Sequence, residues 1–256
     1  MSVTPWIVGQ SKIQPRFRLF CFCYAGGNAI SYLPWQDELD SSIEVCAIQL
    51  PGRGVRMHED LSTSIAQIVE ELLPVIAGRS NVPFAFFGHS LGGIIAFELA
   101  RYLQVRKMTL PVHLLVSGCG APRRHAPDQT ENLSDDAFID LLRDYNGTPL
   151  EVLNNRELMD FLLPSIRSDF NLLETYHYHP GGRLPLPISV LAGRSDTDIA
   201  EDELTDWQFE TSQQCQVHWF EGDHFFIHAA QAEVVAHIDV TILPHLQRQH
   251  IRLMQQ

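Results

Sequence analysis

The chain has 256 residues, 45% of them hydrophobic and 19% charged, and its 18 Lys and Arg against 31 Asp and Glu give a net charge of −13. This composition excludes a disordered protein, a collagen and a coiled coil. The acidic balance argues against duplex nucleic acid as the main ligand, because phosphate binding needs clustered cations. The length allows one or two domains, and we expect a single α/β domain over residues 1–256.

The same sequence predicts a cytoplasmic protein. No stretch approaches the 18 or so consecutive apolar residues of a membrane helix. The first residues, 1–6, lack the charged and then apolar segments of a secretory signal. The five cysteines are odd in number and include no C-x-x-C pair, so we expect no disulfide framework and a reducing compartment.

Strand and helix patterns alternate along most of the chain. Helix patterns lie between short apolar runs rich in Val, Ile and Phe, a rhythm typical of a doubly wound, mostly parallel sheet with helices on both faces. Ser64 and Gln67 have the spacing of a capping box before the first helix. The predicted strands are residues 17–24, 43–50, 84–88, 112–118, 187–193 and 216–220, and the predicted helices are residues 65–76, 91–105 and 234–246.

One region, residues 121–182, breaks this rhythm. It contains no credible strand, and its apolar spacing predicts a helix capped by Ser134 and one or two helices over residues 157–176, with a kink or break at Pro164. An insert of roughly 60 residues is longer than a plain crossover needs. It should lie over the carboxyl edge of the sheet, where α/β sheets bind ligands, so we interpret it as a helical lid.

The segment after the third predicted strand has the form of a nucleophile elbow. Gly88-His89-Ser90-Leu91-Gly92 is the only G-x-S-x-G sequence in the chain, and it lies between a predicted strand and a predicted helix. The turn is too tight for side chains at the two glycines, and it exposes the serine hydroxyl above the sheet. The alternative is a structural turn with a bystander serine.

A serine nucleophile needs a base that is oriented by an acid, and in this fold the chain order is Ser, acid, His. Asp196 ends a late strand and is our choice of acid, with Asp198 as the runner-up. His224 follows the last predicted strand and is our choice of base. His224 and His228 have the spacing of a metal pair, but no third ligand and no His-Glu-x-x-His sequence accompany them, so we expect no metal.

The developing oxyanion needs two backbone donors. One is the N–H of Leu91, directly after the nucleophile, and the other should come from the loop after the first strand. Small residues in that loop, Cys23-Tyr-Ala-Gly-Gly-Asn28, let the backbone approach a substrate closely. Ala25 is our candidate donor, with Gly26 as the alternative. A plain connecting turn is the other reading.

Together these motifs resemble a known family, the stand-alone type II thioesterases. These are α/β-hydrolases that work beside polyketide synthases and non-ribosomal peptide synthetases. The similarity runs from about residue 17 to residue 246. It rests on Phe22-Cys-Tyr-Ala25-Gly26-Gly27, Leu50-Pro51-Gly52-Arg53-Gly54-x-Arg56, Gly88-His-Ser-Leu-Gly-Gly93, Leu172-Leu-Glu174-x-Tyr176, Ala192-Gly193-x-x-Asp196 and Gly222-x-His224-Phe225-Phe226.

The resemblance implies an activity and a set of roles. Such enzymes hydrolyse acyl or aminoacyl thioesters on the phosphopantetheine arm of carrier proteins and so clear stalled units. By this resemblance Ser90 is the nucleophile, Asp196 the acid and His224 the base, with Ala25 and Leu91 as oxyanion donors.

The resemblance also implies partners and a shape. The partners would be acyl or peptidyl carrier protein domains, met transiently by a monomer without a cofactor of its own, and the helical insert would be the lid. Two positions depart from the family pattern: Cys23 stands where Pro is expected, and Asp223 stands where Gly is common. A negative charge at Asp223 would either raise the basicity of His224 or face water.

Several alternatives stay open on sequence grounds. A general carboxylesterase or lipase would use the same three residues, because a fold does not determine the substrate. A fused cyclising thioesterase and a non-catalytic binding protein of the same fold are further readings. Arg53 and Arg56 either anchor their loop through salt bridges or bind the phosphate of the arm. Arg123-Arg124 is either a docking site for the partner or a solvated turn.

Overall fold

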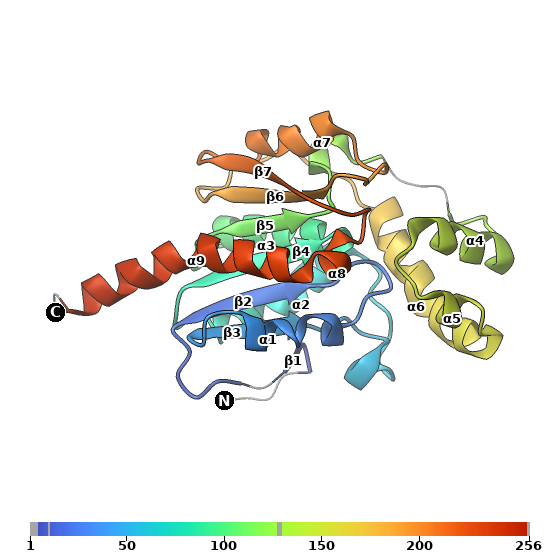
Figure 1. The fold of residues 1–256 in the computed structure, drawn as a ribbon, viewed down its shortest axis with the longest axis horizontal. Helices are drawn as coiled ribbons and strands as arrows, with labels where there is room; N and C mark the ends of the chain where they lie inside the picture. Colours follow the sequence, from blue (N-terminus) through green and yellow to red (C-terminus); the bar gives the residue numbers. More distant parts are fainter. Residues whose placement is uncertain (1–4, 10, 127–129, 255–256) are drawn as a thin grey trace.

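A seven-stranded sheet forms the centre of the computed structural model, with strand order β1-β3-β2-β4-β5-β6-β7 (Figure 1). The strands are β1 (Ile7–Val8), β2 (Phe17–Phe22), β3 (Ile43–Ile48), β4 (Phe84–His89), β5 (Leu114–Ser117), β6 (Ile188–Gly193) and β7 (Cys215–Phe220). The structure describes residues 5–9, 11–126 and 130–254. Residues 1–4, part of the segment searched for a secretory signal, and residues 127–129 of the expected insert lie outside this range.

The sheet is parallel except at β1, which pairs antiparallel with β3. All six predicted strands are present, each within two residues of its expected ends. The sequence pattern missed β1, because two residues are too few to show an alternation. The register puts Phe22 opposite Gly88 and His89 opposite Ser117, so the loops after β2, β4 and β5 begin at the same edge of the sheet.

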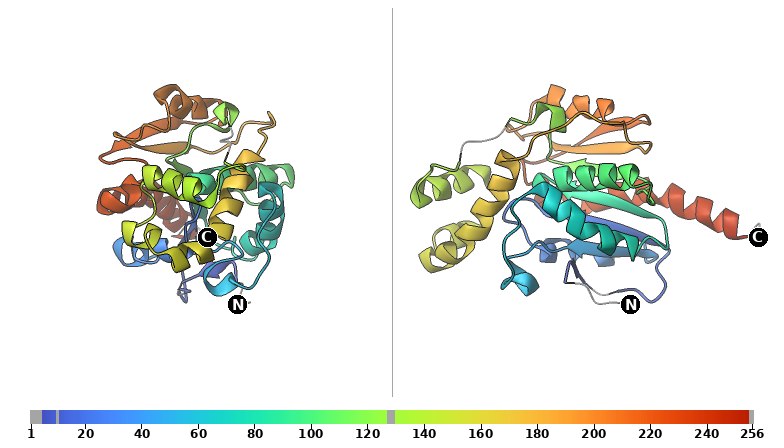
Figure 2. Two further views of the ribbon diagram at one scale, coloured as in Figure 1. Left: turned by 90° about the vertical axis from the view of Figure 1, so that its right-hand side faces the viewer. Right: turned by 180° about the vertical axis from the view of Figure 1, so that it is seen from behind.

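Helices cover both faces of the sheet, as expected. Helices α2 and α3 pack on one face, and α1, α8 and α9 pack on the other (Figures 1 and 2). Within the described range no helix has both the length and the apolar character that crossing a bilayer requires. The helices are α1 (Trp35–Glu38), α2 (Ile65–Ala77), α3 (Leu91–Val105), α4 (Asp135–Tyr145), α5 (Leu150–Leu153), α6 (Arg156–Glu174), α7 (Glu201–Thr205), α8 (Phe226–Ala229) and α9 (Gln231–Met254), with short 3₁₀ turns η1 (Ala29–Tyr32), η2 (Gly54–Arg56), η3 (Pro122–Arg124) and η4 (Asp206–Phe209).

Local signals account for where several helices begin. The Ser64 side chain accepts the N–H of Gln67 at the start of α2, as the capping pattern predicts. The return bond is displaced by one residue, because the Gln67 side chain accepts the N–H of Thr63 instead of that of Ser64. Ser134 caps α4 in the expected way. Residues 157–176 form most of one helix, α6, and Pro164 lies within it without ending it.

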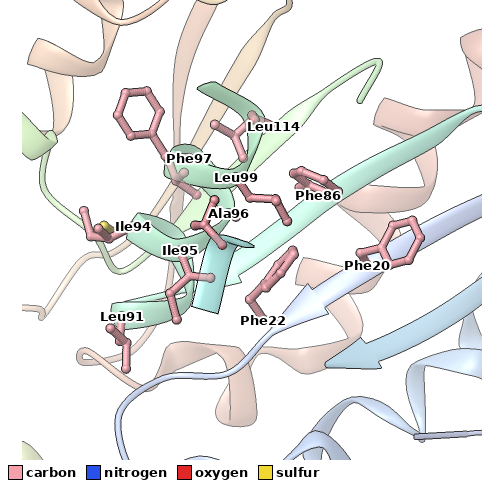
Figure 3. Packing of buried hydrophobic residues seen from close by; sticks show 14 of the residues in the cluster. Phe20, Phe22, Phe86, Leu91, Ile94, Ile95, Ala96, Phe97, Leu99 and Leu114 are labelled. Carbon is pink, nitrogen blue, oxygen red and sulfur yellow. The ribbon is translucent and has the colours of Figure 1, made fainter. Parts of the chain in front are cut away.

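The core explains why α3 is apolar on nearly every side. This helix packs against β4 and also against α2, so it has little surface left for polar side chains. Phe20, Phe22 and Phe86 from the sheet lie beside α3, and the rings of Phe20 and Phe22 both contact Phe86 in edge-to-face pairs (Figure 3). This packing fixes the start of α3, and with it the residue just before the helix, Ser90.

The insert between β5 and β6 carries α4, α5 and α6. The three helices lie together beyond one end of the sheet, at the right of Figure 1 and facing the viewer in the left view of Figure 2. They enclose an apolar cluster of their own, separate from the two clusters of the sheet. Its buried members are Phe138, Leu142, Leu153, Met159, Leu163 and Ile166.

Candidate active site

Ser90 occupies a sharp turn between β4 and α3. Its backbone angles are φ 52° and ψ −119°, an uncommon conformation for a residue with a side chain. The turn is held on both sides: the Ser90 N–H donates to the carbonyl of Ser117 at 2.8 Å, and the N–H of Gly93 donates to the carbonyl of Ser90 at 2.8 Å. This is the geometry of a nucleophile elbow.

The glycines of the elbow are required by close backbone contacts. A Cβ at Gly88 would lie 2.1 Å from the carbonyl oxygen of Gly92, and a Cβ at Gly92 would lie 2.2 Å from that of Phe22. No ordinary side chain fits at such distances. The packing therefore holds the first turn of α3, directly after Ser90, against the end of β2 and the loop that begins with Cys23.

Asp196 and His224 meet at the same edge of the sheet. Nδ1 of His224 and Oδ2 of Asp196 are 2.9 Å apart, and both side chains are at most 10% exposed. Gly193 makes the meeting possible, because a Cβ there would lie 2.3 Å from the carbonyl oxygen of Asp223. Asp198, the runner-up acid, is exposed and donates its backbone N–H to Oδ1 of Asp196 at 3.0 Å.

Hydrogen bonding in the loop after β2 distinguishes its two candidate oxyanion donors, the N–H groups of Ala25 and Gly26. The N–H of Gly26 already donates to Oδ2 of Asp169 at 2.7 Å. Among the described residues, none accepts a hydrogen bond from the N–H of Ala25. Leu91 is the first residue of α3, so its N–H has no acceptor within the helix. Of the two alternatives in this loop, Ala25 therefore has the uncommitted donor.

A second histidine, His89, lies beside His224. His89 is fully buried, its Nδ1 is 2.9 Å from Oγ of Ser117, and its ring centroid is 5.2 Å from that of His224. Burial, followed by the nearby His224 and His228, lowers the pKa of His89 well below its usual value. His89 is therefore neutral and adds no positive charge next to His224.

A cavity of about 510 Å³ connects these residues with the insert. Ser90 and His224 line it together with the loop after β2, the loop after β5 and the inner surface of α4–α6. The insert supplies most of the apolar wall. Its contribution to the wall includes Leu142, Tyr145, Val152, Leu162, Phe170 and Leu173.

A comparison with known protein families identifies the family of this chain. A sequence model described as the thioesterase domain matches residues 17–242, most of the chain. The chain belongs to the thioesterase family. Thioesterases of this α/β-hydrolase fold hydrolyse thioesters, and the geometry around Ser90 agrees with that chemistry.

Related proteins support the same family. The gramicidin S biosynthesis protein GrsT of Aneurinibacillus migulanus is 39% identical over 91% of this chain and 92% of its own length. The type II thioesterase BorB from the borrelidin biosynthetic cluster has a solved structure with a TM-score of 0.81 and 35% identity, covering 90% of this chain and 92% of its own. LgrE of Brevibacillus parabrevis is 40% identical over 96% of this chain and 95% of its own, and its name describes a linear gramicidin dehydrogenase. The family match and the Ser90 turn agree with a thioesterase instead.

One acidic residue near the site, Asp169, was missed by the sequence analysis, whereas Asp223 was noted there as a departure from the family pattern. Asp169 on α6 is 1% exposed and pairs with Arg53. An acid on the apolar stripe of a helix, three residues after Ile166 and three before Leu172, is the signal that could have revealed it. Asp223 lies between the base and the insert, and its Oδ2 accepts from Nδ2 of Asn146 at 2.9 Å.

The arginines singled out in the sequence are engaged in ion pairs. Arg53 bonds Asp169, and Arg56 donates to Glu59 at 2.6 Å while lying over the ring of Trp6, which supports the reading that both anchor their loop. Arg123 and Arg124 are also paired, at 2.9 Å and 2.6 Å, with acidic side chains. Their partners are Glu210 and Asp206, respectively. Docking through these two cations stays a prediction, and it would have to compete with these pairs.

One group of side chains has the spacing of metal ligands. Potential ligand atoms of Asp196, Asp198 and His224 lie within 4.8 Å of one another. The group includes the His224–Asp196 pair, in which Nδ1 of His224 is already bonded to Asp196. Within the described residues, the chain thus offers a metal no donor set separate from these three residues.

Proposed function

We propose that the chain is an editing thioesterase that cleaves acyl or aminoacyl thioesters from the phosphopantetheine arm of carrier proteins. The observation that carries the proposal is the 2.9 Å bond between His224 and Asp196 at a cavity that also contains Ser90. The relatives support the substrate class, because they belong to gramicidin S biosynthesis and to the borrelidin cluster.

The proposed first half-reaction forms an acyl-enzyme on Ser90. Ser90 Oγ attacks the thioester carbonyl while Nε2 of His224 takes the hydroxyl proton. Asp196, bonded to Nδ1, keeps the imidazole in the required tautomer and stabilises its positive charge. The N–H groups of Ala25 and Leu91 donate to the developing oxyanion. The carbon–sulfur bond then breaks, and the phosphopantetheine thiol leaves with the proton from His224.

The second half-reaction releases the product. Water attacks the acyl group on Ser90, and His224 now takes a proton from the water and returns it to Oγ of Ser90. The acid leaves and the enzyme is restored. These steps use no cofactor of the chain, and the phosphopantetheine belongs to the partner.

The insert, residues 121–182, serves in this proposal as the lid of an acyl chamber. Apolar side chains on its inner surface line the cavity beside Ser90, so they would bury an acyl chain and exclude water from the reacting carbonyl. We further propose that a carrier protein docks transiently outside the cavity, that the enzyme acts as a monomer, and that it works in the cytoplasm.

The test compares two esters of the same acyl group. Wild type and Ser90→Ala are each given the acyl group on a phosphopantetheinylated carrier protein and, separately, as an oxygen ester. We expect release from the carrier that Ser90→Ala loses. Fast cleavage of the oxygen ester without turnover of the carrier would point to a general esterase and overturn the proposed substrate class. No hydrolysis of either ester would favour a binding protein.

A further inference from the structure

A buried ion pair joins the insert to the rest of the molecule beside the active site. Arg53 follows β3, and Asp169 lies on α6, 116 residues further along the chain. Their side chains are only 9% and 2% exposed. Both terminal nitrogens of Arg53 donate to the carboxylate, with 2.6 Å between Nη2 and Oδ1. This is the two-pronged geometry that makes Arg–carboxylate pairs both strong and directional.

The same pair holds the loop that carries the candidate oxyanion donor. Oδ2 of Asp169 accepts the N–H of Gly26 at 2.7 Å, and Nη1 of Arg53 donates to the carbonyl of Gly27 at 3.3 Å. The peptide group that joins Ala25 to Gly26 is thereby fixed in orientation. The peptide group that joins Gly27 to Asn28 is held through its own carbonyl.

This loop needs an external restraint. Gly26 has φ +74°, and a glycine has no side chain to favour that conformation over others. Ile166 of α6 packs against it, because a Cβ at Gly26 would lie 3.2 Å from Cγ1 of Ile166. The loop is thus held by α6 on one side, through Asp169 and Ile166, and by Arg53 on the other.

Fold stability alone does not account for a charged pair at this position. Removing two charges from water is costly, and apolar side chains of similar volume often stabilise a buried site as well as an ion pair does. Burial by itself lowers the pKa of Arg53, but the charge and hydrogen bonds of Asp169 outweigh this and raise it, so the guanidinium stays charged. What the pair adds is a set of charge-assisted hydrogen bonds to backbone groups of the loop.

We infer that Arg53 and Asp169 are positioning residues that hold the N–H of Ala25 where the oxyanion develops. The inference rests on the roles proposed above for Ser90 and Ala25. An oxyanion donor contributes to catalysis only when it is fixed in advance, and small displacements of reacting groups are costly. Through Asp169, helix α6 of the insert becomes part of the machinery that stabilises the transition state as well as a wall of the cavity.

The test replaces the pair without leaving a lone buried charge. In Arg53→Met/Asp169→Leu both charges are removed together. A matched control is Arg18→Met/Glu44→Leu, because Arg18 and Glu44 form another buried pair, at 2.6 Å, near the opposite end of β2 and β3. Asp169→Asn is a second variant, which keeps an oxygen for the N–H of Gly26 but leaves the Arg53 charge without its carboxylate. Thermal unfolding of each protein checks that it is folded.

The readout is the separate effect on kcat and on KM with an acyl-N-acetylcysteamine thioester, which involves no carrier protein. We expect kcat of the double variant to fall roughly 10- to 100-fold, less than the 10²- to 10³-fold loss when a donor is removed outright. KM should stay within about twofold, because the interaction acts in the transition state. The control pair should keep kcat within about twofold, and Asp169→Asn should lower kcat with KM unchanged.

Three outcomes would overturn the inference: a folded double variant with wild-type kcat, an equal loss of kcat in the control pair, or a rise in KM with kcat retained. The last would mean that the pair shapes the acyl chamber. If the double variant does not fold, Asp169→Asn decides instead. A lower kcat with KM unchanged supports the inference, and a raised KM with kcat unchanged overturns it. Wild-type hydrolysis that Ser90→Ala loses keeps the proposed chemistry in place whichever result the pair gives.

Discussion

Asp196 and Asp198 lie two residues apart after β6. A comparison of their variants shows which acid supports His224. The side chain of Asp196 bonds Nδ1 of His224. Asp198 donates its backbone N–H to Asp196, and a change of the Asp198 side chain leaves that bond intact. We predict that Asp196→Asn lowers kcat about 10⁴-fold by favouring the wrong tautomer, as the equivalent change does in serine proteases. Asp198→Asn should lower it less than about tenfold. Steady-state kinetics on one thioester compares them, and the reverse order would make Asp198 the acid.

A substitution at Gly92 measures how tightly the turn around Ser90 is packed. A Cβ there would lie 2.2 Å from the carbonyl oxygen of Phe22, a backbone atom, and both residues are buried. We predict that Gly92→Ala lowers the free energy of unfolding by more than about 2 kcal/mol, as strained core changes do. Gly182→Ala is the control, because its nearest atom would be 3.9 Å away. Denaturant unfolding of the two variants measures the difference, and equal midpoints would contradict the prediction.

At the scale of elements, the insert contacts the loop that carries the base. Asn146 at the end of α4 has φ 57° and donates to Oδ2 of Asp223, and a Cβ at Gly147 would lie 2.1 Å from the ring of Phe225. Oδ1 of Asp223 accepts the N–H of Phe225 at 2.9 Å. The structure adds a third role to the two weighed for this aspartate, a bridge between the insert and the loop of His224.

We predict that Asn146→Gly loosens this contact while keeping the left-handed backbone that glycine tolerates. The hydrogen bond is exposed, so the free energy of unfolding should change by less than about 1 kcal/mol. Faster amide exchange in α4 and a KM raised a few-fold are expected, because the closed cavity becomes less populated. Unchanged exchange in α4 would show that the contact does not hold the insert in place.

Elements are also where sequence reasoning succeeded and where it stopped. Long apolar runs predicted the six parallel strands, because burial on both faces leaves a strong local signal. The two-residue β1 has no such signal, and it forms only because β3 offers an edge. The position of Asp169 on the apolar side of α6 was visible, but its partner lies 116 residues away. Nothing local in the sequence links the two.

For the molecule as a whole, the free energy of unfolding at low pH depends on histidines that are buried in their neutral form. Burial, followed by the nearby His245, His237 and His218, lowers the pKa of His113 to about 4. The unfolded chain binds a proton near pH 6.5 and the folded chain near pH 4. Stability should therefore fall as the pH drops through this window, by an amount on the order of 2–3 kcal/mol for this group.

The variant His113→Gln isolates this effect. It replaces a titrating ring by an amide that can still bond Oγ of Ser189, which is 2.9 Å from Nε2 of His113. We predict that its free energy of unfolding declines less steeply than that of wild type between pH 6.5 and pH 4. Urea unfolding at several pH values gives both curves. Parallel curves would mean that His113 does not contribute to acid sensitivity.

The shape of the cavity belongs to this largest scale and was beyond the sequence. Motif spacing predicted that Ser90, Asp196 and His224 follow strands that end at one edge, because parallel strands align their carboxyl ends. The volume of about 510 Å³ depends on how α4–α6 pack over that edge. That packing rests on contacts such as the one between Gly147 and Phe225, 78 residues apart.

The central claim is that Ser90 is a nucleophile activated by His224 and Asp196. The most direct measurement is the rate at which a fluorophosphonate probe labels wild type, His224→Ala and Ser90→Ala, with the labelled residue located by mass spectrometry. An activated serine reacts quickly, and its reactivity depends on the base. We expect rapid labelling of wild type at Ser90, much slower labelling of His224→Ala, and no label in Ser90→Ala. Wild type that stays unlabelled, or that is labelled at another residue, would contradict the claim.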